Sequence, residues 1–409
     1  MRRGQRVKRF LSGMLALGMV LVTVWAAGAL LSPVPVLVAE QRPPSLDALG
    51  MDGGVLALPV TGASAVIAGT GSPLSGGEAA ALPIAGLAKV VLAHVVLDRA
   101  PLEPGAPGPA TAITAEDVQR LRALQASSVR TVAVAGGQVW TQFDLIAATV
   151  IGSGNNTAEI LAVSAFGTLE GYLLAAGEWL AENGLADTIV VDPTGIGSGS
   201  IATAADMARL AQLTVAQPVL LDLLLQRPTA APTTGTTWSD NAAFPGGTGA
   251  LGAATTYTDA AGVCTLLILP VGDSYAGVIL LAQPDYPTAE AAVALLIPQV
   301  TTALQPVPLI DAGAVVGELV ADWGQRTDLV TTDPVTIVAL DASAVEFDYA
   351  LDTQRTVLRG ASVGRLTVTT PTGDQTVRLE TTTTITEPGV AWRFADPFTV
   401  LDRWLGETG

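Results

Sequence analysis

Residues 82–98 read LPIAGLAKVVLAHVVLD, and the organisation of the chain can be worked out from this stretch. Apolar side chains fill most positions, which predicts an apolar helix. The helix carries Lys89, the only lysine after residue 8, and Gly86, a residue type that weakens helices, stands three positions earlier. A buried ammonium group is costly unless it is hydrogen-bonded. We therefore expect Lys89 to hydrogen-bond Ser153 or Asn155, or to have a lowered pKa.

The spacing of positions 86 and 89 matters because residues three apart are neighbours on a helix. A serine at position 86 would point its hydroxyl along the face of the lysine amine. That is the Ser-x-x-Lys arrangement of acyl transfer, in which the lysine helps to remove the serine proton. Gly86 has no hydroxyl, so the pair Gly86–Lys89 on its own carries no catalytic signal.

The start of the chain predicts a membrane segment. MRRGQRVKR carries five basic groups, and no charged residue follows from Phe10 to Leu31. At 1.5 Å per residue this run is ~33 Å long, enough to cross a bilayer. The flanking positive charge places the N-terminus in the cytoplasm and the remainder outside. The alternative is a signal peptide cleaved near residues 27–29 (AGA), which also leads to export.

Composition excludes several functional classes. Five of the 20 basic residues precede residue 10 and no acidic residue does, so the remainder carries 15 basic against 37 acidic groups, a net charge of −22. This charge argues against nucleic-acid binding. With one cysteine, Cys264, and one histidine, His94, neither an intramolecular disulfide nor a structural zinc site is expected. We expect no cofactor.

The composition and residue patterning of the sequence predict four regions. Residues 1–31 form the basic stub with its membrane anchor or signal peptide, and 32–51 are a Pro-rich linker. Residues 52–304 mix helical and strand patterns. Residues 305–409 alternate Thr and Val between Gly-Asp turns, which predicts an all-β domain. Within it GAVVGELV (313–320) returns as GASVGRLT (360–367), so we expect a small β-sandwich built from two related halves.

Three segments of the middle region resemble one family. Residues 83–89 read PIAGLAK, residues 153–155 read SGN, and residues 252–264 read GAATTYTDAAGVC. They are similar to the P-x-A-S-x-x-K, Ser-x-Asn and G-x-K-T-G-x-T-x-x-A-G-x-C motifs of the serine D-alanyl-D-alanine carboxypeptidases, the low-molecular-mass penicillin-binding proteins. The stretch GLADTIVVDPTGIGSGSIATAADMARLA (184–211) also resembles theirs.

The spacing of the family motifs is retained, but the nucleophile and the substrate-binding lysine of the third motif are absent. Lys89, Ser153 and Asn155 stand at retained family positions, but the nucleophile position holds Gly86. In the third motif, Ala254-Thr255-Thr256 replaces Lys-Thr-Gly. In the family that lysine holds the terminal carboxylate of the substrate, so Ala254 implies weaker binding. Thr256 adds a Cβ and a hydroxyl where glycine allows close approach. Loss of a catalytic serine costs about a millionfold in rate.

The resemblance implies an α+β fold: a β-lactamase/transpeptidase-like domain, with an antiparallel sheet flanked by helices, followed by the β-sandwich. It also implies an inactive homologue at the bacterial cell membrane, with a peptidoglycan stem peptide or a cell-wall enzyme as partner. Two alternatives stay open: an active carboxypeptidase that uses Ser153 as nucleophile, and a structural envelope protein without a ligand. An open cleft in which Lys89, Ser153 and Asn155 converge would favour binding, whereas a filled cleft would favour the structural alternative.

Overall fold

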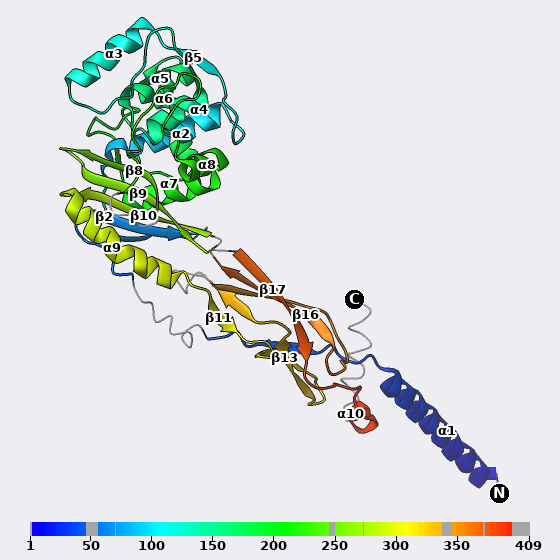
Figure 1. Cartoon of the computed structure of the whole chain (residues 1–409). Coiled ribbons are helices and arrows are strands. Elements are labelled where there is room, and N and C mark those ends of the chain that lie inside the picture. The colour runs from blue at the N-terminus through cyan, green and yellow to red at the C-terminus, as the bar shows by residue number, and fades with distance from the viewer. Residues whose placement is uncertain are drawn as a thin grey trace.

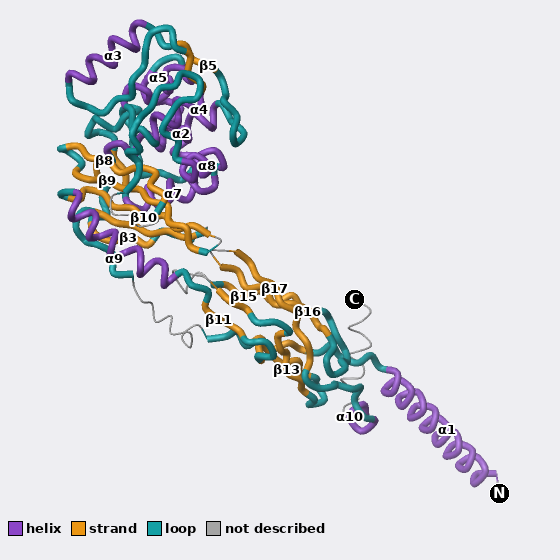
Figure 2. The backbone as a smooth tube through the Cα atoms, in the orientation of Figure 1, coloured by secondary structure: helices purple, strands orange, loops and turns teal. Residues whose placement is uncertain are grey.

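The computed structural model of the chain describes residues 2–45, 56–69, 71–244, 250–272, 274–337, 345–370 and 373–394. Three parts follow one another in space (Figure 1): a head of helices around a sheet, a β-domain, and the long helix α1 (Arg2–Leu31). Helix α1 projects from the end of the β-domain that lies farthest from the head. Helices and strands are mixed in the head and strands dominate the middle part (Figure 2), which confirms the expected α+β class.

The head is built on a five-stranded antiparallel sheet in the order β3-β2-β10-β9-β8. Its central strands are mostly apolar, as expected for strands buried on both faces. In β10, Val278 and Leu280 face one core while Ile279 and Leu281 face the other. The strands are β2 (Ala63–Ala68), β3 (Leu74–Gly77), β8 (Leu251–Thr258), β9 (Gly262–Val271) and β10 (Ser274–Gln283).

Helices cover both faces of this sheet. Helix α9 (Tyr286–Ala303) packs on one face, and α7 (Ala204–Ala216) packs on β2, β9 and β10 from the other. The helical lobe lies beyond α7 (Figure 1). Its elements are β4 (Leu82–Pro83), β5 (Ala110–Ala112), α3 (Ala115–Ala126), β6 (Val139–Thr141), α4 (Gln142–Val150), α5 (Asn155–Phe166), α6 (Leu169–Glu182), β7 (Ile201–Ala202) and α8 (Pro218–Gln226).

The apolar stretch that opened the sequence forms the central helix of this lobe. A short 3₁₀ helix, η2 (Ala85–Leu87), leads directly into α2 (Ala88–Arg99), and α2 is buried from Ala88 to Leu97. It contacts α4, α5 and α6. The single histidine, His94, is a packed core residue that contacts Thr214 at 3.0 Å and stacks on Trp179. Burial lowers its pKa to about 3, so the imidazole is neutral.

The β-domain contains a six-stranded antiparallel sheet, β1-β12-β13-β17-β16-β15. The two repeat copies lie in β12 and β16, each of which has a β-bulge, before Gly317 and Gly364 respectively. A two-stranded sheet, β11-β14, shares the same core. The strands are β11 (Val307–Ile310), β12 (Val315–Val320), β13 (Arg326–Thr331), β14 (Val335–Ile337), β15 (Glu346–Leu351), β16 (Ser362–Thr370) and β17 (Gly373–Thr381), and a short helix, α10 (Val390–Phe394), follows.

Part of the expected linker 32–51 belongs to this sheet. Strand β1 (Val38–Gln41) pairs antiparallel with β12, so the linker interpretation is wrong for these residues. Just after β1, Arg42 forms a 2.6 Å ion pair with Glu318 of β12. The Pro-rich composition of residues 32–51 obscured the strand pattern of β1. This strand lies at the edge of the sheet, where proline is best tolerated.

Candidate functional site

The three family-like segments meet in one cleft of about 630 Å³ between the helical lobe and the edge strand β8. The cleft is lined by Lys89 from α2, Ser153 from the turn before α5, Asn155 from the first position of α5, and Thr255 and Thr256 from β8. The vacated position Gly86 lies at its floor. Ala254 lies deeper, in a closed space lined also by Gly86 and Thr256. The structure thus brings every sequence-predicted site residue together.

The amine of Lys89 is buried and hydrogen-bonded, though not as expected. Its Nζ donates to the backbone carbonyl of Thr194 at 2.7 Å. Within the described residues it makes no hydrogen bond to Ser153 or Asn155, so the first of the two expected outcomes is not met. The expected pKa depression is present: desolvation lowers the pKa of Lys89 from 10.5 to about 7, opposed by attraction to Asp192 and assisted by repulsion from Arg130.

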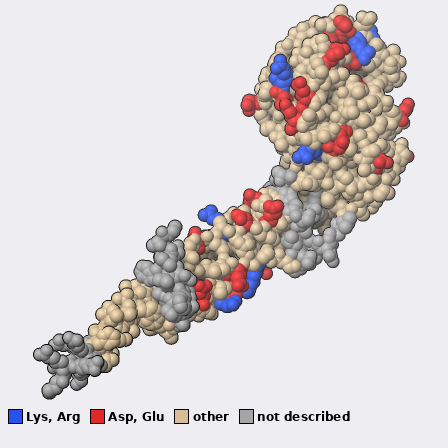
Figure 3. All heavy atoms as spheres, turned by 180° about the vertical axis from the view of Figure 1, so that it is seen from behind, with Lys and Arg blue, Asp and Glu red and all other residues tan. Residues whose placement is uncertain are grey.

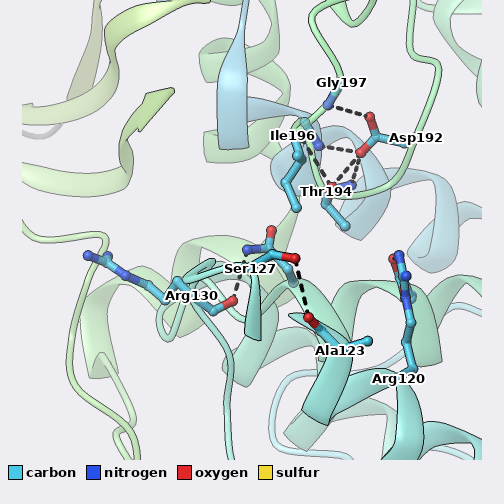
Figure 4. A network of polar contacts seen from close by, with 11 residues as sticks. Arg120, Ala123, Ser127, Arg130, Asp192, Thr194, Ile196 and Gly197 are labelled. Carbon is cyan, nitrogen blue, oxygen red and sulfur yellow. Dashed lines mark hydrogen bonds and ion pairs between the residues drawn. The ribbon is translucent and has the colours of Figure 1, made fainter. Parts of the chain in front are cut away.

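The loop that supplies the Thr194 carbonyl is organised by one carboxylate. Asp192 accepts hydrogen bonds from Thr194 N (2.7 Å) and Oγ1 (2.5 Å), Gly195 N (2.6 Å) and Gly197 N (3.0 Å). Figure 4 shows this loop facing the segment of Ser127 and Arg130. A Cβ on Gly195 would lie 1.7 Å from the carbonyl oxygen of Ala85, so only glycine fits there.

Sequence reasoning missed the role of this loop. The segment 192–195 (DPTG) was matched to the family as a string, with no partner assigned to Lys89. An aspartate followed by Thr and Gly is typical of a turn in which the side chain binds backbone N–H groups, and that signal could have located the loop.

The side chain of Thr256 occupies the space that a side chain at position 86 would need. A Cβ built on Gly86 would lie 2.7 Å from Thr256 Cγ2 and 3.1 Å from Lys89 Nζ. The Gly86 backbone N–H donates to Thr256 Oγ1 at 3.1 Å. A backbone N–H at such a position is the kind of donor that stabilises a developing oxyanion. Thr256 therefore removes both the space for a nucleophile and a potential oxyanion donor.

Two residues beside the cleft hold unusual backbone conformations. Ala85 has a φ of 45° and Ser153 a φ of 52°, both in the left-handed region that favours glycine. Such conformations cost about 1–3 kcal/mol each and persist only where the surroundings enforce them. The two segments that flank the cleft floor thus hold a strained geometry around Gly86, which carries no hydroxyl.

The cleft also contains polar atoms without partners. The Nδ2 of Asn155 donates to the carbonyl of Arg130 at 2.8 Å, but its Oδ1 is buried and has no partner within the described residues. The same holds for Thr255 Oγ1. A buried acceptor without a donor costs about 1–3 kcal/mol.

Charge in the cleft is sparse. Ala254 brings no cation, so the basic residues that line the cleft are Lys89, whose pKa is lowered to about 7, and the exposed Arg130, and Asp259 is the acid. Within the described ranges, no group of three or more His, Cys, Asp or Glu residues is arranged to hold a metal ion.

Comparison with known proteins agrees with this geometry. A family model described as D-alanyl-D-alanine carboxypeptidase matches residues 66–269. The fold is similar to penicillin-binding protein 6B from Escherichia coli, with 16% identity, a TM-score of 0.58, and coverage of 80% of this chain and 98% of that chain. Penicillin-binding protein 5 from Haemophilus influenzae gives 16% identity, a TM-score of 0.55, and coverage of 82% and 100%.

A third similar structure is the D-alanyl-D-alanine carboxypeptidase DacD from Francisella tularensis. It has 17% identity, a TM-score of 0.53, and coverage of 82% of this chain and 95% of that chain. No curated protein sequence matches the chain. At these identities the solved structures establish the fold, whereas the family model identifies the matched region.

The buried amine generates a prediction about stability. As pH falls from 10.5 to 7 the unfolded chain takes up a proton on Lys89 and the folded chain does not, so the folded state loses stability over that window. The loss is on the order of 4 kcal/mol. Replacing Lys89 with Met should remove this part of the pH dependence. Denaturant unfolding of both proteins at several pH values in this window tests it, and an unchanged pH slope in Lys89→Met would contradict it.

Proposed function

Because the chain belongs, through residues 66–269, to the D-alanyl-D-alanine carboxypeptidase family, we propose that it is an exported, catalytically inactive member of that family. The family acts in peptidoglycan metabolism. The inactive homologue would serve there as a binding or scaffolding protein, with a peptidoglycan stem peptide or a cell-wall enzyme as its partner.

One observation carries the proposal of inactivity: the side chain of Thr256 occupies the space that a nucleophile at Gly86 would need. Acyl transfer requires a nucleophile within reach of its base. At position 86 no such atom exists, and the Lys89 amine is held by the carbonyl of Thr194. The two substitutions fit each other, since a small residue on η2 faces a larger one on β8.

The alternative nucleophile, Ser153, lines the same cleft as Lys89. It is nearly buried, and no hydrogen bond joins its hydroxyl to the amine within the described residues. Since a general base must reach the proton that it removes, this arrangement supports the inactive assignment over an active enzyme that uses Ser153. A reaction at Ser153 remains an outcome that the experiment below would detect.

Helix α1 supports membrane attachment. Phe10–Leu31 is long and apolar enough to cross a membrane, and only 6% of its most apolar window is buried in the protein. The part of α1 that is visible in Figure 3 shows no charged side chain. With the basic stub on the cytoplasmic side, the head and the β-domain would lie outside the cell.

The open cleft supports a binding role over a purely structural one. Side chains leave about 630 Å³ free, and Asn155, whose buried Oδ1 has no partner within the described residues, lines this space. Amide groups of a peptide would provide hydrogen-bond donors. Without the lysine at position 254, we expect the free terminal carboxylate to contribute little to binding.

A penicillin tests the inactivity directly. Mass spectrometry after incubation should find no adduct on the native protein, and none on Gly86→Ser, because Thr256 still fills the site. The double variant Gly86→Ser/Thr256→Gly should form an adduct on the serine introduced at position 86. The control Gly86→Ser/Thr258→Gly, which opens the same strand two residues further on, should stay unmodified.

The position of any adduct decides between the alternatives. An adduct on Ser153 of the native protein would establish the active enzyme, and one on Thr256 would make the blocking residue itself a nucleophile. Either result would refute the inactive assignment. Labelling of Gly86→Ser alone would contradict the steric role given to Thr256.

A binding experiment separates the binding role from the structural one. A synthetic stem peptide should bind the purified protein weakly, and Asn155→Ala should weaken the affinity by about tenfold, the equivalent of one hydrogen bond to a buried acceptor. Isothermal titration calorimetry measures both. Ser164→Ala, in a separate groove of the helical lobe, is the control and should bind normally. No heat of binding from the native protein would favour the structural alternative.

A further inference from the structure

The cleft extends beyond its floor at Gly86. Strand β8 is the last strand of its sheet, so one of its edges is free, and the cleft passes along this edge. Thr256 and Tyr257 are consecutive in the strand, so their side chains point to opposite faces of the sheet. Thr256 faces the helical lobe at Gly86, and Tyr257 therefore lies on the side of α9. The cleft thus has an outer end, across the β8 edge from its floor.

Two tyrosines stand at this outer end. Tyr257 is 50% exposed, and Tyr286, the first residue of α9, is 38% exposed. Both line the cleft. In the part of the head that the structure describes, every other aromatic side chain is buried or half-buried. Two exposed rings in the same concave site indicate a surface for ligand contact.

A carboxylate joins the two rings. The Tyr257 hydroxyl donates to Oδ1 of Asp259 at 3.0 Å, and this bond raises the pKa of Tyr257, with a smaller contribution from Tyr286. Tyr286 is therefore close to the same group. A carboxylate can accept about four hydrogen bonds, and from the described residues Asp259 accepts this one. Asp259 thus orients the Tyr257 ring and retains acceptor sites for a ligand.

This set of groups matches the chemistry of a sugar. A pyranose has an apolar face of C–H groups, which packs on an aromatic ring, and a rim of hydroxyls, which can donate to a carboxylate. Further hydroxyls line the cleft on Thr258 and Ser128. An anionic ligand would be repelled by Asp259, and an apolar peptide side chain would leave its oxygens without a donor. A neutral saccharide satisfies both the rings and the carboxylate.

We propose that Tyr257, Tyr286 and Asp259 form a subsite for a neutral saccharide at the outer end of the cleft. The rings contact the faces of the sugar, and Asp259 accepts its hydroxyls. The inference rests on the proposed function, in which a peptide lies beside Asn155, and it names the ligand class as a glycopeptide. Asp259 is three residues from Thr256, a span of at most about 11 Å, so one glycopeptide can reach both ends of the cleft.

Titration with defined ligands tests the subsite. The probes are a tetrasaccharide of N-acetylglucosamine, a bare stem peptide, and the same peptide attached to a disaccharide. Ligand-observed NMR titrations with the full-length protein in detergent give each Kd. The native protein should bind the tetrasaccharide, and it should bind the glycopeptide about tenfold more tightly than the bare peptide, because the sugar adds the two ring contacts.

Variants that remove one ring at a time locate the contact. Tyr257→Ala and Tyr286→Ala should each weaken tetrasaccharide binding by about fivefold, and each should reduce the advantage of the glycopeptide over the bare peptide. Tyr286→Phe keeps the ring and should bind as the native protein does. The control is Leu295→Ala, which removes an exposed apolar side chain from the same helix and should also bind normally.

The outcomes separate the two proposals. If the bare peptide binds and the rings give the sugar probes no advantage, the saccharide subsite is refuted while the proposed function stands. If the tetrasaccharide binds and the bare peptide does not, the subsite stands and the peptide-binding role fails. An equal loss of bare-peptide affinity in the alanine variants would assign the rings to the peptide and overturn the subsite. Binding of none of the three probes would refute both proposals.

Discussion

The contact between Gly86 and Thr256 is the constraint on which the site depends. It joins the start of the central helix to the edge strand of the sheet, and it determines what the cleft floor can hold. In an acyl-transfer site that floor needs a hydroxyl next to an amine. Here the methyl group of Thr256 occupies that space, and the hydroxyl of Thr256 accepts a hydrogen bond from the Gly86 N–H. The fold remains intact because the two residues compensate each other in volume, in keeping with the close packing of protein interiors.

The burial of Lys89 follows from the same arrangement. With no serine beside it, the amine is satisfied by the carbonyl of Thr194, and the carboxylate of Asp192 holds the loop that provides it. Removing a nucleophile therefore leaves a lysine that still needs a partner. Contacts among the loop, the helix and the strand hold them together around an open cleft.

The sequence predicted the fold class, through the family resemblance, and the central apolar helix, through local periodicity. It also located the cleft, through motifs whose spacing survives. It could not predict the partner of Lys89 or the strand β1, since both depend on contacts between segments more than one hundred residues apart. The steric fit between Gly86 and Thr256 also requires coordinates, although the added bulk at Thr256 was visible in the sequence.

A crystal structure of the native protein soaked with a penicillin tests the central claim most directly. The Thr256 methyl should face Gly86, and any ligand density in the cleft should be separate from the protein. Continuous density between the ligand and Ser153 or Thr256 would contradict it, because the cleft would then still perform acyl transfer.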